Sequence, residues 1–135
     1  MPLDFPDSPA VDQAYVSGAT TWIFNGTAWE LASKETAVQP IETKSDSYEL
    51  LTTDAGKVIA MNKATAQTVT VGATLDLAVG QRIDIIQTGA GQVTVSASST
   101  TVNGTPGLKF RAQYSAASLL CVGNDSYILM GDLSA

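Results

Sequence analysis

Residues 79–97 read VGQRIDIIQTGAGQVTVSA and contain the clearest strand pattern of the chain. Ile83 and Ile85 alternate with polar residues before a Gly-Ala-Gly turn, and Val93 and Val95 alternate with polar residues after it. The two glycines of the turn permit the positive φ that a tight reversal needs. We therefore expect a β-hairpin with one apolar face, which the rest of the fold must cover.

From residue 48 onward the chain consists of short apolar runs separated by turn residues, which is the pattern of a β-sandwich or barrel. The last two runs, residues 118–122 and 126–130, are the most apolar, and they predict a closing hairpin that is apolar on both faces. Both of those faces need a cover, either the other sheet and the N-terminal arm or a second subunit. The sequence thus predicts an all-β protein with a compact antiparallel β-sandwich or barrel over residues 48–135.

Residues 1–30 predict a small N-terminal β-hairpin arm. They begin with a proline-led segment that blocks a helix, and they contain Asn25-Gly26, a strong hairpin signal. Counting outward from this turn places Trp22 opposite Trp29. Such an arm is too small to be stable alone, so we expect it to pack on the body, on another subunit or on a larger partner. Residues 31–47 show no sustained period and predict a linker, with a short helix over residues 32–38 as the alternative.

Composition excludes several classes of function. The 135-residue chain has no histidine, which removes the usual general base and the commonest metal ligand. Cys121 is the only cysteine and lies in an apolar run, so it predicts a core residue. Seven basic residues against thirteen acidic ones give a net charge of −6, which does not suit nucleic acid. We expect neither an enzyme nor a cofactor or metal protein.

One glycine-containing segment and one charged pair have plain structural interpretations. Asp54-Ala-Gly-Lys57 lacks the ligand spacing of a calcium loop and the Gly-Lys-Ser/Thr of a phosphate loop, so it predicts a turn. Arg82 and Asp84 lie on the same face of one predicted strand and could form an exposed ion pair, worth about 0–1 kcal/mol.

No segment has the roughly 20 apolar residues of a membrane span, and no signal peptide is evident, so we expect a protein made in the cytoplasm without a membrane partner.

Two blocks of the chain resemble a recurrent module of tailed-bacteriophage virion proteins. The first is the proline-led segment FPDSP at residues 5–9 with TWIFNGTAW at residues 21–29. The second comprises DAGKVIAMN at residues 54–62, GQRIDIIQTGAGQVTV at residues 80–95, QYSAA at residues 113–117 and ILMGDL at residues 128–133. Together these blocks cover most of the chain outside the predicted linker.

The resemblance implies a virion structural protein, found either as a capsid decoration (cement) protein or as a tail-fibre module. No heptad or short repeat of a fibre shaft occurs, and the short chain starts with its own Met, so we expect a decoration protein that binds and stabilises the outer capsid surface. The implied partners are the major capsid protein or other virion proteins, and the implied assembly is a homotrimer. The alternative is a tail-fibre or spike module that binds host-surface glycan.

The residues expected at a protein interface are aromatic or large and apolar, because such side chains dominate interfaces. For the N-terminal tryptophans and their aromatic neighbours, packing within the protein and glycan binding remain alternatives. The predicted interface residues are Phe5, Tyr15, Trp22, Phe24, Trp29, Tyr127 and Leu129.

Overall fold

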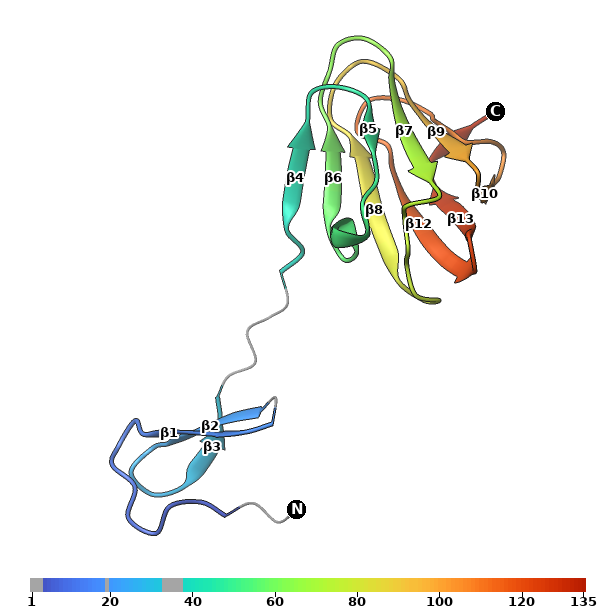
Figure 1. The fold of residues 1–135 in the computed structure, drawn as a ribbon. Helices are drawn as coiled ribbons and strands as arrows, with labels where there is room; N and C mark the ends of the chain where they lie inside the picture. The colour runs from blue at the N-terminus through green and yellow to red at the C-terminus, as the bar shows by residue number, and fades with distance from the viewer. Residues whose placement is uncertain (1–3, 19, 33–37) are drawn as a thin grey trace. The chain divides into compact units, whose positions relative to one another are not determined.

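The computed structural model describes residues 4–18, 20–32 and 38–135, and the chain divides into two units, Met1–Val38 and Gln39–Ala135 (Figure 1). The helix considered for residues 32–38 falls almost entirely outside the described residues.

The first unit contains a three-stranded antiparallel sheet in the order β1 (Ala14–Ser17), β2 (Thr20–Phe24), β3 (Trp29–Leu31). The predicted pairing of the two tryptophans is wrong, because Phe24 lies opposite Trp29 and Trp22 lies opposite Leu31. The turn is longer than two residues: the Asn25 side-chain oxygen accepts hydrogen bonds from the backbone N–H groups of Thr27 and Ala28, at 2.9 and 2.8 Å. This side-chain turn shifts the register of the hairpin.

The second unit is a sandwich of two sheets (Figure 1). A six-stranded sheet has the order β10-β13-β12-β8-β6-β4, and a five-stranded sheet has the order β14-β11-β9-β7-β5. The elements of this unit are β4 (Ile41–Lys44), β5 (Tyr48–Glu49), the 3₁₀ turn η1 (Thr52–Asp54), β6 (Val58–Met61), β7 (Gln67–Gly72), β8 (Arg82–Gln87), β9 (Val93–Ser98), β10 (Thr101–Gly104), β11 (Lys109–Phe110), β12 (Ala116–Gly123), β13 (Ser126–Gly131) and β14 (Leu133–Ser134).

The core of the sandwich is formed by alternate residues of both sheets, so the expectation of an all-β sandwich is confirmed. Cys121 is buried in this core, as expected, and its thiol lies 3.3 Å from the carbonyl oxygen of Leu77. The fully buried residues with the largest side chains include Leu50, Ile59, Met61, Leu75, Ile83, Ile85, Phe110, Leu119, Tyr127 and Leu129.

The expected hairpin over residues 79–97 is wrong, because β8 and β9 belong to different sheets. The glycine segment is an arch that carries the chain from one sheet to the other. Inside it the buried Gln87 side chain takes the place of strand pairing: its amide nitrogen lies 3.3 Å from the Gly89 carbonyl oxygen, and its oxygen accepts the Val93 N–H at 3.0 Å. A hairpin and an arch bury the same alternate residues, so the sequence pattern suits both.

The antiparallel expectation is also wrong for the first half of the body. Strands β4, β6 and β8 pair in parallel in one sheet, and β5, β7 and β9 pair in parallel in the other. Each return between parallel strands passes through the opposite sheet, which supplies the long crossover that parallel pairing needs. The result is three stacked arches, β4–β5, β6–β7 and β8–β9. Only β11, β12, β13 and β14 add antiparallel pairs in this unit, while β10 pairs in parallel with β13.

Glycine is required in the third arch by close approach rather than by backbone conformation. Neither Gly89 nor Gly91 has a φ between +20° and +160°. A Cβ at Gly89 would overlap the backbone of Lys63, and a Cβ at Gly91 would overlap the carbonyl of Thr65. The Gly91 N–H donates to the Lys63 carbonyl oxygen at 2.9 Å, so the third arch rests directly on the backbone of the second.

The predicted linker, residues 31–47, extends too far at its C-terminal end, because β4 is a strand of the six-stranded sheet. Glu42 and Lys44 occupy the positions that Ile59 and Met61 occupy on the neighbouring strand β6. Inward-facing charged residues are typical of a sheet edge that must not pair further. They remove the apolar alternation by which a strand is recognised in sequence.

Candidate functional site

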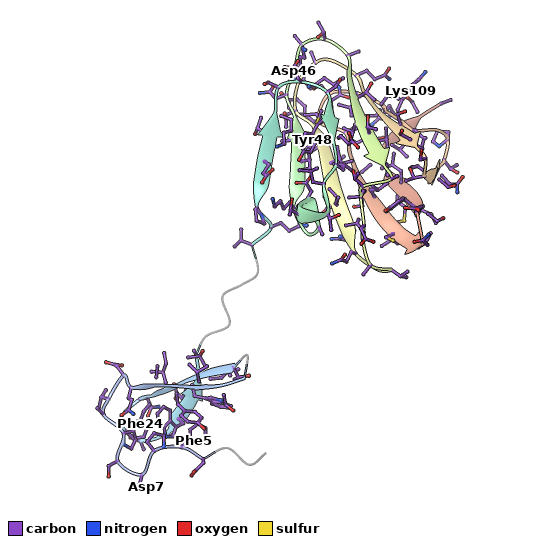
Figure 2. The ribbon with its side chains drawn as sticks, in the orientation of Figure 1. Phe5, Asp7, Phe24, Asp46, Tyr48 and Lys109 are labelled. Atoms are coloured by element: carbon purple, nitrogen blue, oxygen red, sulfur yellow. The ribbon has the colours of Figure 1, made fainter. Side chains whose placement is uncertain are left out.

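Five aromatic residues gather on one face of the three-stranded sheet. Phe5, from the proline-led segment, stacks on Trp29 with ring centroids 5.0 Å apart and an interplanar angle of 14°. Its ring also meets Tyr15 and Trp22 edge-on, at 5.1 and 5.6 Å, and Phe24 lies 5.5 Å from Trp29. Figure 2 labels Phe5 and Phe24 of this group. The structure therefore brings together all five predicted interface residues of this unit, which we call the aromatic cluster.

Phe5 connects this cluster, since it touches three of the other four rings. Its stacking on Trp29 occupies a ring face that a sugar would need for stacking. All five residues remain partly exposed. The described residues of this unit include the acidic residues Asp4, Asp7, Asp12 and Glu30 and no lysine or arginine. Glu30 lies opposite Ile23, on the other face of the sheet from the cluster.

The sequence did not single out Val11, Val16 and Ile23, which are 63%, 65% and 38% exposed. Ile23 lies on the opposite face of the sheet from Trp22 and Phe24, because successive strand residues alternate. For Val16 and Ile23, the alternation of side chains along a strand could have indicated these exposed apolar positions, whereas Val11 precedes β1 and has no such signal.

Tyr127 and Leu129 are not available to a partner, so their prediction as interface residues is wrong. Each is 1% exposed, and the Tyr127 hydroxyl donates to the Leu75 carbonyl oxygen at 2.8 Å inside the core. The outward positions of strand β13 belong instead to Ile128 and Met130, which are 38% and 47% exposed. Because both sets of alternate residues are apolar, the sequence could not tell which set faces the core.

Ionisable side chains cluster at the β4–β5 end of the sandwich. Lys57 Nζ lies 2.7 Å from Glu42 Oε1, and Lys44 Nζ lies 3.3 Å from Glu42 and 4.2 Å above the Tyr48 ring. Asp54 is buried and accepts hydrogen bonds from the Tyr48 hydroxyl and the Leu51 N–H, both at 2.9 Å. Each of these charged groups has a partner within the fold, so a structural role accounts for the cluster.

Replacing Tyr48 with phenylalanine is expected to lower the free energy of unfolding by about 1–3 kcal/mol at neutral pH, because Asp54 loses a buried donor. Burial, and then the hydrogen bond to Asp54, raise the pKa of Tyr48 from 10.0 to about 12. The stability that this hydroxyl adds is therefore complete below pH 10 and lost as the pH rises to 12.

Urea unfolding of the wild type and Tyr48→Phe across that pH range measures this effect. The stability difference between the two proteins should shrink as the pH rises. Tyr114→Phe is the control, because Tyr114 is 71% exposed. A stability difference between the wild type and Tyr48→Phe that stays constant from pH 10 to 12 would contradict the assignment of that stability to the Tyr48 hydroxyl.

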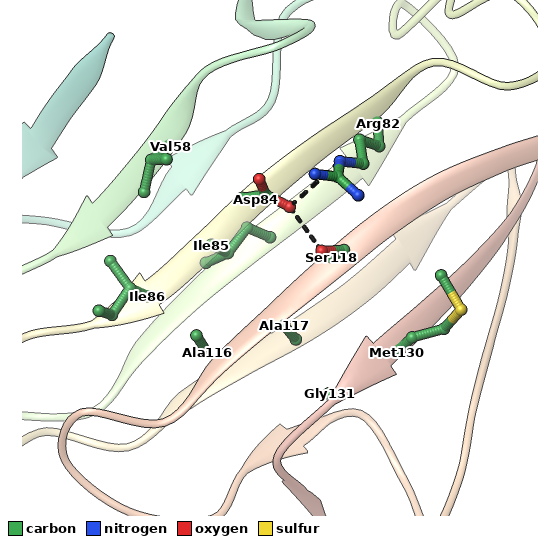
Figure 3. Close-up of a pocket in the computed structure, with 10 residues that line it drawn as sticks. All are labelled: Val58, Arg82, Asp84, Ile85, Ile86, Ala116, Ala117, Ser118, Met130 and Gly131. Atoms are coloured by element: carbon green, nitrogen blue, oxygen red, sulfur yellow. Dashed lines mark hydrogen bonds and ion pairs between the residues drawn. The ribbon is translucent and has the colours of Figure 1, made fainter. Parts of the chain in front are cut away.

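The outer face of the six-stranded sheet has a shallow groove of about 420 Å³ (Figure 3). Strands β8, β12 and β13 supply most of its lining, and Arg82, Asp84 and Ser118 are its polar members. A second groove of about 470 Å³ adjoins it through Met130 and Gly131 and reaches Asn103. The expected proximity of Arg82 and Asp84 is present, with 3.8 Å between Nε and Oδ1.

Over the described residues, no group of three or more acidic or cysteine side chains is arranged to hold a metal ion. Within the same residues, no helix has the length and apolar character needed to cross a membrane. No family model matches the chain, and no curated protein sequence matches it.

Proposed function

We propose that this chain is a non-enzymatic structural protein of a tailed-phage virion, made in the host cytoplasm, which binds the outside of the capsid as a homotrimer and reinforces the head. The observation that carries the proposal is the division into a small unit with an acidic, aromatic surface and a larger β-sandwich. A small aromatic unit suits an anchor on another protein, because aromatic side chains surrounded by polar ones form interface hot spots. The sandwich then covers part of the outer capsid surface.

Two further observations support a structural role. The ionisable groups at the β4–β5 end are paired with one another, and the sequence resembles virion modules in both units. The alternative, a fibre or spike module that binds host glycan, is disfavoured by the stacking of Phe5 on Trp29, which occupies ring faces inside the aromatic cluster. The proposed partner is the major capsid protein.

Locating the protein on intact particles tests the proposal. Virions that carry an epitope-tagged copy of the chain are labelled with gold-conjugated antibody and imaged by negative-stain electron microscopy. We expect label distributed over the head. Label confined to the tail would contradict the decoration role and favour the fibre alternative, and virions without label would contradict both.

A further inference from the structure

The two outward faces of the sandwich differ sharply in chemistry. On the five-stranded sheet the outward residues are polar, namely Thr68, Thr70, Thr94, Ser96, Lys109 and Ser134. On the six-stranded sheet most are aliphatic. We call Val58, Ile86, Ala116, Leu120, Ile128 and Met130 the aliphatic face. Aliphatic side chains gathered on one outward side of a sandwich mark a site that another surface can cover.

Strand register places one charged pair within this aliphatic face. Asp84 lies between Val58 and Ser118, and Arg82 lies beside Leu120. Figure 3 shows both charged side chains among the aliphatic ones, with dashed lines from Asp84 to Arg82 and Ser118. The pair adds no net charge, although the whole chain carries −6.

The two arginines of the chain differ in how they use their donors. Arg111 donates two hydrogen bonds to the Asp132 carboxylate, one from Nε at 2.6 Å and one from Nη2 at 2.9 Å. Arg82 is 3.8 Å from Asp84, beyond hydrogen-bond distance, and its side chain is 59% exposed. Its guanidinium donates no hydrogen bond to the described residues and is exposed to a partner, and arginine is one of the residue types enriched at interface hot spots.

We propose that copies of this chain assemble through the aliphatic face, with Arg82 of each copy pairing with Asp84 of the next. Further copies are the occupant that matches the face, because around a three-fold axis the aliphatic residues of each copy can meet those of its two neighbours, and the one cation of each copy can meet the one anion of the next. The N-terminal unit fits less well: its described residues are acidic and contain no lysine or arginine to face Asp84. This proposal deepens the homotrimer and rests on that part of the proposed function.

Neighbouring residues of the same chain hold the Asp84 carboxylate in place and charged for such a pairing. Ser118 donates to one carboxylate oxygen, and Gln39 donates to the other at 2.9 Å. Burial raises the pKa of Asp84, but these hydrogen bonds and the charge of Arg82 outweigh it and leave the pKa below its ordinary value. The carboxylate is therefore held in place and charged, with lone pairs left for a partner's guanidinium.

Light scattering coupled to size-exclusion chromatography of the full chain tests the proposal. The wild type at about 10 µM should have three times the 14.0 kDa mass of the chain. Arg82→Glu should weaken assembly about tenfold or more, because like charges then meet across the interface. Met130→Glu, at a 47% exposed position, should do the same without altering the charged pair.

Lys109→Glu is the matched control, because it reverses a charge on the polar outward face. Circular dichroism melting checks that each variant is folded. A monomeric wild type would overturn both the trimer and this interface. A trimer that persists in Arg82→Glu and Met130→Glu, or one that Lys109→Glu dissociates equally, would overturn this interface alone.

Discussion

Gly91→Ala is expected to lower the free energy of unfolding of the body by about 3 kcal/mol or more. The added methyl group would overlap the carbonyl of Thr65, a backbone group that cannot move without the arch to which it belongs. The hydrogen bond from Gly91 N to Lys63 O would be stretched at the same time. Urea denaturation followed by circular dichroism measures the loss.

Gly123→Ala provides the control for this prediction. A Cβ at that position would meet only the Ser126 Cβ at 3.6 Å, an ordinary contact. Its expected effect is below about 1 kcal/mol. Equal stability of Gly91→Ala and Gly123→Ala would show that the second and third arches are not in direct backbone contact.

Trp29→Ala is expected to unfold the N-terminal unit while leaving the body intact. Trp29 contacts Phe5, Tyr15 and Phe24, so its removal opens the aromatic cluster. Truncating a packed tryptophan costs about 3–5 kcal/mol. A unit of this size has little stability to lose, because chains below about 40 residues rarely fold without a disulfide, a metal or a partner. The only cysteine of the chain, Cys121, lies in the other unit.

Amide NMR spectra of the full chain follow the two units separately. In Trp29→Ala the resonances of residues 1–38 should move to random-coil positions, while those of residues 39–135 stay in place. Co-sedimentation with undecorated heads should show binding weakened about tenfold or more, if this unit is the anchor. Ile23→Ala, on the opposite face of the sheet, should leave both the spectrum and the binding nearly unchanged. If Trp29→Ala bound heads as tightly as the wild type, the anchor would lie in the body and not in the N-terminal unit.

The aromatic cluster was the most accessible part of the candidate site to sequence reasoning. The hairpin signal at Asn25-Gly26 placed Trp22, Phe24 and Trp29 in strands, and aromatic residues at these positions suggested a common surface. The stacking of Phe5 on Trp29 depends on how the proline-led segment folds back. Neither that return nor the longer turn made by the Asn25 side chain has a periodic signal in the sequence.

Which residues of the closing hairpin face outward could be assigned only from the structure. Leu119, Cys121, Tyr127 and Leu129 point into the core, whereas the intervening residues of β12 and β13 form part of the aliphatic face. Since both sets are largely apolar, the two possible orientations bury similar hydrophobic groups. Only the registers with β8 and the opposing sheet distinguish them.

Local sequence patterns alone predict an all-β protein, a small aromatic unit before a larger body, and the residues of β8 and β9 that enter the core. Those properties follow from local alternation and turn residues, which act over a few positions. The tertiary structure decided that β8 and β9 belong to opposite sheets and that the arches stack in parallel. The reason is that alternation reports which side of a strand is buried, whereas the partner of its backbone N–H and C=O groups is chosen by contacts distant in sequence, such as Gly91 on Lys63.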